Sequence, residues 1–190
     1  MARRADGERR PLYDADRMAD GIEAIARGVA PLVAPRNSAL VGVRTRGLTI
    51  TRRLHQRVQE LAGRPLPLGI LDITLYRDDL STLGPQPKVG MSHLPFDVDG
   101  CTVVVIDDVL FTGRTARASI DALIAFGRPS AIRLAVLVDR GHREYPIHAD
   151  VAAFTVPTSR GDIVEVNLRE NDGRDGIDLL AGASEESTGG

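Results

Sequence analysis

Two adjacent carboxylates, Asp107 and Asp108, stand between an apolar segment and a loop that carries hydroxyl groups. The apolar segment, 102–106, consists of β-branched residues and suits a strand that is buried on both faces. The loop, 112–115, reads Thr-Gly-Arg-Thr, and a helical pattern follows it over 116–126. Such a unit can hold a sugar phosphate, because carboxylates accept hydrogen bonds from ribose hydroxyls while loop amides and the helix N-terminus bind the phosphate.

The acidic pair allows several kinds of chemistry from residue type alone. It could bind a metal ion, act as a general acid and base, accept hydrogen bonds from two neighbouring hydroxyls, or belong to a solvated loop. Consecutive side chains of an extended segment point in opposite directions, so joint coordination of one ion by Asp107 and Asp108 is awkward. A bend at the strand exit would turn both toward a sugar, and a divalent cation would then be carried mainly by substrate phosphates.

The loop at 112–115 has a phosphate-binding interpretation and a plainer one. Gly113 permits close approach of the backbone to a ligand, and the following helix has its positive end at this point. The loop is not a Walker A motif, because the Gly-Lys-Ser/Thr ending is absent. Its Thr-Gly pair could instead serve as a helix cap, since Ser and Thr are common capping residues.

Two further arginine-bearing segments could supply positive charge to a second anion. Residues 44–47 read Arg-Thr-Arg-Gly after another apolar segment and offer cationic and hydroxyl donors. Arg77 stands at the start of a long connection, 77–92, which could close onto a polyanion and exclude water. Taken alone, residues 44–47 would be a plain turn into a helix, and Arg77 could form a surface ion pair with Asp78 or Asp79.

Alternating strand and helix patterns along the chain must position these residues. Apolar residues recur on one face of three predicted helices, at 14–33, 48–62 and 116–126. Apolar runs predict strands at 39–43, 66–76, 93–96, 102–106, 131–138, 151–156 and 163–168. The alternation indicates an α/β fold with a mainly parallel central sheet flanked by helices.

Polar loops follow several of these strands at their carboxyl ends. In an open α/β sheet, ligands bind outside the carboxyl ends of the strands. We therefore expect one cleft, formed by loops from separate parts of the chain: 44–47, 77–92, 107–115 and 139–144.

The length of 190 residues fits one well-buried domain. We expect this domain to span 12–172, after a flexible N-terminal arm at 1–11 and before a C-terminal tail at 173–190 that is partly disordered. The single cysteine, Cys101, excludes an internal disulfide framework and a cysteine-rich metal site. No apolar run approaches the ~20 residues that cross a bilayer, and the N-terminus lacks the apolar stretch of a signal peptide, so we expect a cytoplasmic protein.

Four separate blocks of the sequence resemble one known family. Residues 103–115 match the signature of type I phosphoribosyltransferases, in which apolar residues precede two acids and a Thr-Gly phosphate loop. Residues 40–47, 72–79 and 137–144 are similar to one subfamily, the bifunctional pyrimidine-operon attenuation regulators and uracil phosphoribosyltransferases. The likeness covers residues 12–170 and implies the type I phosphoribosyltransferase fold, with a flexible loop and a small hood.

The resemblance implies a reaction and a role for each matching residue. Uracil and 5-phosphoribosyl-1-pyrophosphate would give UMP and pyrophosphate, with Mg²⁺ carried by the substrate and not bound by the protein directly. Asp107, Asp108 and Arg77 would be the catalytic residues, whereas Arg140 and the backbone near Val164 would border the uracil. The phosphoribosyl and pyrophosphate groups would bind to Thr45, Arg46, Asp107, Asp108, Val109, Leu110, Phe111, Thr112, Gly113, Arg114 and Thr115.

The same resemblance implies UMP-dependent binding of pyrimidine-operon messenger RNA, and a homodimer or larger homo-oligomer. The chain departs from the family pattern where RNA-facing residues are expected. Ile22 and Ala26 replace polar or basic residues in the first helix, and Phe154 replaces the lysine of a Gly-Lys-Asn segment. Losing such donors weakens phosphate contacts, although Arg140 and Arg143 are retained. Two alternatives stay open: a nucleotide-sensing RNA-binding regulator with weak catalysis, and a phosphoribosyltransferase for a purine or orotate.

Overall fold

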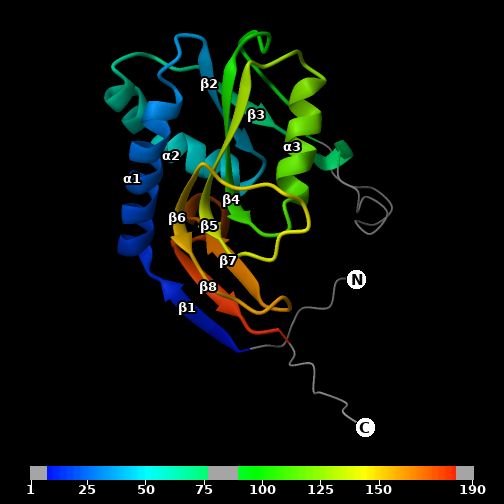
Figure 1. Cartoon of the computed structure of the whole chain (residues 1–190). Coiled ribbons are helices and arrows are strands. Elements are labelled where there is room, and N and C mark those ends of the chain that lie inside the picture. The colour runs from blue at the N-terminus through cyan, green and yellow to red at the C-terminus, as the bar shows by residue number, and fades with distance from the viewer. Residues whose placement is uncertain (1–7, 77–89, 183–190) are drawn as a thin grey trace.

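A five-stranded parallel sheet forms the centre of the computed structural model, which describes residues 8–76 and 90–182 (Figure 1). The strands lie in the order β3-β2-β4-β5-β6, and every neighbouring pair is parallel. Their carboxyl ends therefore meet at one edge of the sheet, as the fold class predicted. The strands are β2 (Ser38–Val43), β3 (Leu68–Leu71), β4 (Thr102–Leu110), β5 (Ala131–Asp139) and β6 (Val151–Thr155).

Helices cover both faces of this sheet. Helices α1 (Ala15–Leu32) and α2 (Arg46–Ala62) pack against each other on one face, and α3 (Arg114–Ile124) lies on the other (Figure 1). Alternate residues of β4 enter two hydrophobic cores, one on each face. A strand buried on both faces must be apolar on both, which explains its β-branched run.

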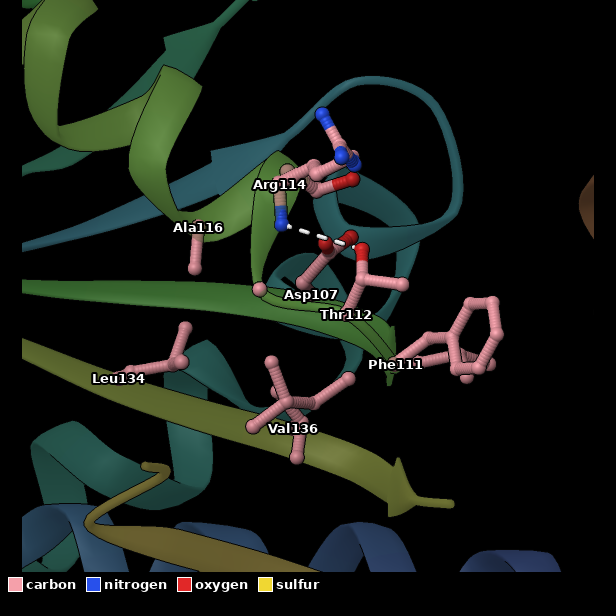
Figure 2. Close-up of a pocket in the computed structure, with 11 residues that line it drawn as sticks. Asp107, Phe111, Thr112, Arg114, Ala116, Leu134 and Val136 are labelled. Atoms are coloured by element: carbon pink, nitrogen blue, oxygen red, sulfur yellow. Dashed lines mark hydrogen bonds between the residues drawn. The ribbon is translucent and has the colours of Figure 1, made fainter. Parts of the chain in front are cut away.

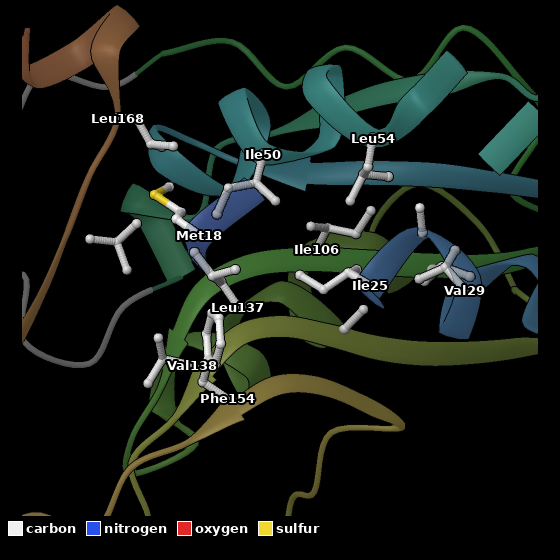
Figure 3. Close-up of a cluster of buried hydrophobic side chains, with 14 of the residues drawn as sticks. Met18, Ile25, Val29, Ile50, Leu54, Ile106, Leu137, Val138, Phe154 and Leu168 are labelled. Atoms are coloured by element: carbon white, nitrogen blue, oxygen red, sulfur yellow. The ribbon is translucent and has the colours of Figure 1, made fainter. Parts of the chain in front are cut away.

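The larger core lies between α1, α2 and the sheet (Figure 3). Met18 and Ile25 of α1, Ile50 of α2, Ile106 of β4 and Leu137 of β5 are all fully buried there. Their spacing on the helices follows the predicted apolar faces. The helices are thereby fixed against the strands whose ends carry the candidate site.

A second, smaller sheet brings the two ends of the described chain together. Strands β1 (Arg9–Tyr13), β7 (Ile163–Asn167) and β8 (Gly176–Leu180) form an antiparallel sheet in the order β1-β8-β7. The four-residue helix α4 (Arg169–Asp172) joins β7 to β8. We call this unit the hood. It lies beyond the carboxyl ends of β4 and β5 (Figure 1), where a ligand is expected.

The helix predictions are confirmed closely. Helix α1 begins after Asp14, whose carboxylate accepts a hydrogen bond from the Arg17 amide at 2.9 Å. Helix α2 ends at Gly63, which has a φ of +65° and closes the helix in the left-handed conformation. No helix in residues 8–76 and 90–182 is long and apolar enough to cross a membrane.

The strand predicted at 66–76 is shorter than expected. Strand β3 ends at Leu71, and residues 74–76 form a single 3₁₀ turn. The Asp72 carboxylate accepts a hydrogen bond from the Thr74 amide at 2.9 Å, so a side chain takes the place of a strand partner.

The strand predicted at 93–96 is wrong as an extended element. It contributes one antiparallel bridge, between Ile70 and His93, with both hydrogen bonds at 2.8 Å. Residues 77–89 lie outside the described residues, so the expected lid stays a prediction.

The predictions for the two ends of the chain differ from the structure. Residues 9–11 of the expected flexible arm belong to β1, and residues 176–180 of the expected tail form β8, which is largely buried. The two strands pair with each other, and Arg9 adds ion pairs to Glu165 and Asp178 at 2.8 and 2.7 Å. Long-range pairing of this kind leaves no local signal in the sequence.

Candidate active site

The two carboxylates lie near the carboxyl end of β4, which continues past them to Leu110. Asp107 is 9% exposed and lies in register with Val136 of β5. Each carboxylate accepts a hydrogen bond from the next amide: Asp107 Oδ1 from Asp108, and Asp108 Oδ1 from Val109, both at 3.0 Å. A regular strand and not a mobile loop therefore positions the acidic pair.

A cavity of about 370 Å³ opens where β4 ends and α3 begins (Figure 2). It is lined by two residues of β5, by the end of β4 and by the loop that follows: Leu134, Val136, Asp107, Val109, Leu110, Phe111, Thr112, Gly113, Arg114, Thr115 and Ala116. We call it the first pocket. Its lining includes the whole predicted phosphate loop and the first turn of α3, an arrangement that binds anions well.

The 112–115 loop is supported by the chain that follows β5. The Thr112 carbonyl accepts hydrogen bonds from the amides of Glu144 and Tyr145 at 2.8 and 3.1 Å. Gly113 has a φ of +91°, which glycine adopts without steric cost. The Arg114 amide faces the Thr112 hydroxyl at 3.4 Å (Figure 2). The loop thus has a defined shape beside the pocket.

Arg143 strengthens this support. Its guanidinium donates to the carbonyls of Phe111 and Ile147 at 2.7 and 2.9 Å, and it forms an ion pair with Asp139. Burial raises the pKa of the Asp139 carboxyl, but hydrogen bonds from Arg143 and the Gly141 amide outweigh burial and lower that pKa below its usual value. Asp139 therefore stays charged and holds Arg143 in place.

A second pocket adjoins the first. It is lined by residues from the ends of β2 and β4, from the segment after β3 and from the starts of α2 and α3: Val43, Arg44, Thr45, Arg46, Ile73, Thr74, Asp107, Asp108, Val109 and Thr115. Three residues, Asp107, Val109 and Thr115, line both pockets. The structure thus brings the predicted loops 44–47 and 107–115 together in one cleft.

Gly47 allows the 44–47 segment to approach β4. A Cβ atom on this residue would lie 2.5 Å from the carbonyl oxygen of Ile106 and 3.0 Å from the Cα of Asp107. Such distances are shorter than van der Waals contact permits, so glycine is required here. The Arg44–Thr45 peptide bond in the same segment is cis.

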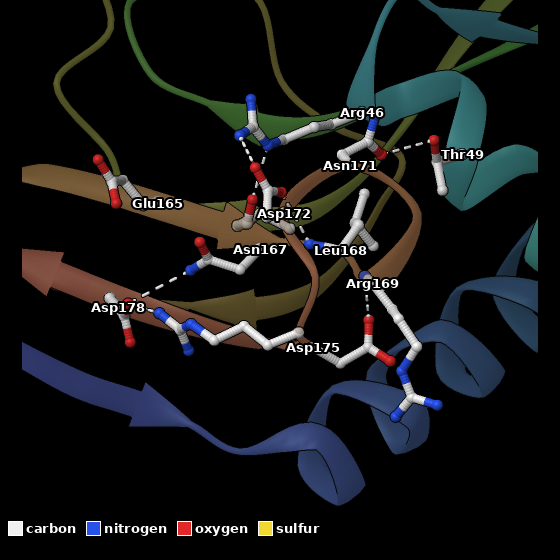
Figure 4. Close-up of polar contacts among 12 residues, drawn as sticks. Arg46, Thr49, Glu165, Asn167, Leu168, Arg169, Asn171, Asp172, Asp175 and Asp178 are labelled. Atoms are coloured by element: carbon white, nitrogen blue, oxygen red, sulfur yellow. Dashed lines mark hydrogen bonds and ion pairs between the residues drawn. The ribbon is translucent and has the colours of Figure 1, made fainter.

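Arg46 connects the cleft to the hood (Figure 4). Its Nε donates to the Val166 carbonyl and its Nη2 to the Asp172 carboxylate, both at 2.7 Å. The neighbouring Thr49 hydroxyl donates to Asn171 at 2.9 Å. The hood and the start of α2 are therefore joined beside the second pocket.

The two residues predicted on the uracil side are not among the residues that line either pocket. Arg140 is 5% exposed; its guanidinium lies 3.9 Å from the Phe111 ring centroid and donates to the Ser159 carbonyl at 2.9 Å. Burial lowers the pKa of Arg140 from its usual value. Val164 belongs to the larger hydrophobic core and lines neither pocket. Arg140 contacts the first pocket only indirectly, because its guanidinium packs on Phe111, which lines that pocket. Arg77 lies outside the described residues.

The positions expected to face RNA belong instead to the core. Ala26 is buried, Ile22 is half-buried, and Phe154 is 8% exposed. The Phe154 ring stacks on Tyr13 with centroids 4.1 Å apart. A Cβ on Gly21 would lie 2.5 Å from that ring, so the aromatic side chain fills the space beside α1.

Comparison with known proteins also indicates a phosphoribosyltransferase. Residues 10–170 match the family described as phosphoribosyl transferase domain. The chain is 50% identical over 171 residues to the bifunctional protein PyrR of Thermus aquaticus, with 90% of each chain covered. It is 49% identical over 166 residues to the bifunctional protein PyrR of Pelotomaculum thermopropionicum, covering 85% of this chain and 92% of the relative. The chain belongs to the PyrR family of phosphoribosyltransferases.

Solved structures support the fold of this PyrR-family chain. A hypoxanthine phosphoribosyltransferase of Trypanosoma cruzi in complex with IMP has a TM-score of 0.67 at 16% identity, covering 96% of this chain and 98% of that one. A hypoxanthine-guanine phosphoribosyltransferase of Bacillus anthracis has a TM-score of 0.66 at 14% identity, covering 93% and 99%. The predicted type I phosphoribosyltransferase fold is confirmed, while the roles of single residues stay predictions.

Sequence reasoning missed several residues that shape the PyrR-family cleft. Thr74 and Ile73 line the second pocket, and Leu134 and Val136 form the floor of the first. Gly47 was read with its neighbours, but its contact with β4 was not foreseen. The missing information is spatial, because these residues become part of the site through strands that pair across the sheet.

Proposed function

We propose that the protein transfers a phosphoribosyl group from 5-phosphoribosyl-1-pyrophosphate to uracil and forms UMP and pyrophosphate. One observation carries this proposal: two adjoining pockets share Asp107 and Thr115, and each is bordered by its own candidate anion-binding segment, 112–115 and 44–46. A sugar that is phosphorylated at both ends needs two anion sites with hydroxyl acceptors between them. The choice of uracil rests on the likeness to the bifunctional PyrR proteins.

The described residues act in this proposal by positioning the substrate and balancing charge. The 112–115 loop holds the 5′-phosphate, Asp107 and Asp108 accept the ribose hydroxyls, and Thr45 and Arg46 hold the pyrophosphate. Positive charge develops on the ribose ring as the bond to pyrophosphate breaks, and negative charge grows on the leaving group. The two carboxylates stabilise the positive charge on the ribose, and Arg46 stabilises the negative charge on the pyrophosphate. No covalent nucleophile is therefore required.

Mg²⁺ enters with the substrate in this proposal. The second pocket presents oxygen atoms of Asp107, Asp108 and Thr45, and oxygen is the ligand that Mg²⁺ prefers. Among residues 8–76 and 90–182, no group of three or more His, Cys, Asp or Glu side chains could hold a metal ion. Substrate phosphates would supply the other ligands, and the bound ion would neutralise the diphosphate.

The uracil side is proposed to lie beyond Phe111. Arg140 fixes the segment around Thr158 and Ser159 by hydrogen bonds at 3.3 and 2.9 Å, and its guanidinium packs on the Phe111 ring. Main-chain groups of an ordered segment can read the edge of a pyrimidine. Val164 contributes through its backbone, and Arg77 assists the leaving pyrophosphate.

A direct assay tests the proposal. The purified protein is incubated with 5-phosphoribosyl-1-pyrophosphate, Mg²⁺ and one base at a time: uracil, hypoxanthine, guanine or orotate. We expect UMP from uracil and at least tenfold lower rates with the other bases, since a base site that pairs polar edges rejects mismatched ones strongly, by roughly 10-fold or more. If only a purine or orotate gives a nucleotide, uracil is not the substrate and that base takes its place in the proposal.

We also propose regulation of transcription attenuation through UMP-dependent messenger RNA binding, because the relatives are named bifunctional. The buried Phe154 and Ala26 offer no charge to RNA phosphates, so surface arginines must provide the contacts. Binding of pyrimidine-operon leader RNA is measured with and without UMP across a salt series. Affinity that rises with UMP and falls with salt supports regulation; no dependence on UMP rejects it.

Sedimentation of the same samples tests the proposed homo-oligomer.

A further inference from the structure

Asp72 is a nearly buried carboxylate directly after β3. It begins the 72–79 block of the family resemblance, but no role was assigned to it there, and the proposed mechanism does not use it. It is 8% exposed. Its Oδ1 accepts hydrogen bonds from the Thr74 amide at 2.9 Å and the Thr74 hydroxyl at 2.6 Å. Its Oδ2 accepts one from the Gly90 amide at 2.7 Å and lies 3.6 Å from Arg44 Nε. One side chain thus connects three segments of the chain.

Two of these partners form a wall of the second pocket. Thr74 and Arg44 both line it, together with the acidic pair of β4. Asp72 itself lies behind this wall and is not part of the lining. It therefore acts on the pocket through Thr74 and Arg44 and not by touching a ligand.

The contact with Gly90 is closely fitted. A Cβ on Gly90 would lie 2.4 Å from Asp72 Oδ2 and 3.0 Å from Arg44 Nε. A second hydrogen bond joins the same two segments, because the Asp72 amide donates to the Ser92 hydroxyl at 2.9 Å. The close packing leaves the carboxylate no alternative position.

The balance of forces keeps Asp72 charged. Burial raises its pKa, but the hydrogen bonds from Thr74 and Gly90 and the nearby Arg44 guanidinium outweigh burial, so the pKa lies below its usual value. A charged carboxylate at this place holds the Arg44 side chain near the pocket by attraction over 3.6 Å.

We propose that Asp72 is a positioning residue for the diphosphate end of the substrate: it fixes Arg44 and Thr74 in the wall of the second pocket. The inference rests on the proposed function, in which this pocket receives the pyrophosphate. The 5′-phosphate binds at the 112–115 loop, which Asp72 does not contact. Loss of Asp72 should therefore affect ligands that carry a diphosphate and spare a ligand that carries the 5′-phosphate alone.

The test is Asp72→Asn. The asparagine oxygen can still accept from Thr74, but its NH₂ group would face the Gly90 amide and Arg44, which are themselves donors. We expect about tenfold weaker binding of Mg²⁺-pyrophosphate and of 5-phosphoribosyl-1-pyrophosphate, the size of effect that loss of a charged hydrogen bond produces. UMP affinity should stay within about twofold. Calorimetry measures all three on wild type and variant.

Asp99→Asn is the matched control. Asp99 also accepts a main-chain hydrogen bond, from Arg128 at 2.6 Å, but it precedes β4 at the opposite end of that strand. All three affinities should match wild type in this control. If Asp72→Asn does not fold, Gly90→Ala disturbs the same contact from the other side and should give the same selective loss.

The outcomes separate this inference from the proposed function. Equal weakening of UMP and pyrophosphate, or no weakening of either, overturns the positioning role. Wild-type protein that binds pyrophosphate and UMP but makes no UMP from uracil contradicts the proposed function, while the binding split still decides the role of Asp72.

Discussion

Asp107 and Asp108 are neighbours in the sequence but face different parts of the cleft. Asp107 lines both pockets, whereas Asp108 lines the second one. Side chains alternate along a strand, which explains the difference. The same alternation disfavours joint coordination of one metal ion by the two carboxylates. A ribose that spans both pockets would meet the two carboxylates from different directions.

The double variant Asp107→Asn plus Asp108→Asn should abolish activity and leave the fold intact. Each asparagine oxygen can still accept the hydrogen bond from the following amide, but the negative charge beside the ribose is lost. We expect kcat/KM to fall by about 10²-fold or more, as for loss of a charge-stabilising group. Steady-state kinetics and circular dichroism measure the two effects. Wild-type turnover would show that the pair has no role in the reaction.

At this scale the sequence predicts residues whose type alone indicates chemistry. The acidic pair, the 112–115 loop and residues 44–46 all line the cleft. Asp72 begins the 72–79 block but received no role, because the contribution of a single aspartate depends on Thr74 and Gly90 meeting it in space.

Helix α2 begins at Arg46, two residues earlier than predicted, because its first turn lies against β4. The contact runs through Gly47, with no room for a side chain beside the Ile106 carbonyl. The element that carries Thr45 and Arg46 is thereby placed at a fixed distance from the acidic pair. The absence of a side chain at Gly47 therefore sets both the position of α2 and the distance across the cleft.

Gly47→Ala tests this link. A methyl group 2.5 Å from a backbone oxygen must push α2 away from β4. We expect destabilisation of about 1–3 kcal/mol, typical of overpacking, and at least tenfold lower kcat/KM. Urea denaturation and kinetics provide the two readouts. Gly161→Ala is the control, because its Cβ would meet nothing nearer than 3.7 Å. Equal effects in both variants would contradict the argument.

Elements with a strong period or a long apolar run are predicted well, and short paired segments are not. Helices α1 and α2 show an apolar face that repeats with the helical period, so their bounds come within two residues. The segment at 93–96 looks like a strand by composition, yet it pairs at one residue, His93. The local sequence does not distinguish a segment that forms a single β-bridge from one that forms a full strand.

Ion pairs join helix α2 to the hood, beside the hydrophobic core that they share. Arg53 of α2 bonds to Glu170 and Asp175, and Arg46 bonds to Asp172. The hydrogen bond from Arg53 lowers the pKa of Glu170 below its usual value. Burial raises the pKa of Asp175, but Arg53 outweighs burial and lowers it. These contacts fix the hood over the cleft.

Arg53→Gln should loosen the hood, with an effect that depends on pH. Both carboxyls have folded pKa values below their unfolded ones, so their contribution to stability is present above the unfolded values near about 4 and is lost as pH falls through the folded values. We expect the variant to be less stable by about 1–2 kcal/mol at pH 7, with the difference shrinking below about pH 4.

Urea denaturation at several pH values measures this difference, and amide exchange in β7 and β8 should quicken at neutral pH. Arg17→Gln is the control, since Arg17 pairs with Asp20 at 3.5 Å on the exposed side of α1. A pH-independent difference for Arg53→Gln would argue against the ion pairs as its source.

The fold class and the cleft follow from the sequence, and the family resemblance implies a small hood, but the strands that build this hood were not predicted as one sheet. Its strands come from both ends of the chain, and the ion pair between Arg9 and Asp178 joins residues 169 positions apart. Apolar patterning indicated β7 but gave no sign that β1 would pair with β8. Composition near the ends suggested disorder, and pairing between them overrides that tendency.

The sheet order of the hood also sets the sequence of events during synthesis on the ribosome. Strand β1 is synthesised before the other described elements, yet its neighbour in the sheet, β8, is synthesised after them. The parallel sheet can assemble while β1 waits with an unpaired edge, a state that invites wrong partners. The nascent chain therefore acquires its hood, and with it the Arg46 contacts at the cleft, only after the parallel sheet has been synthesised.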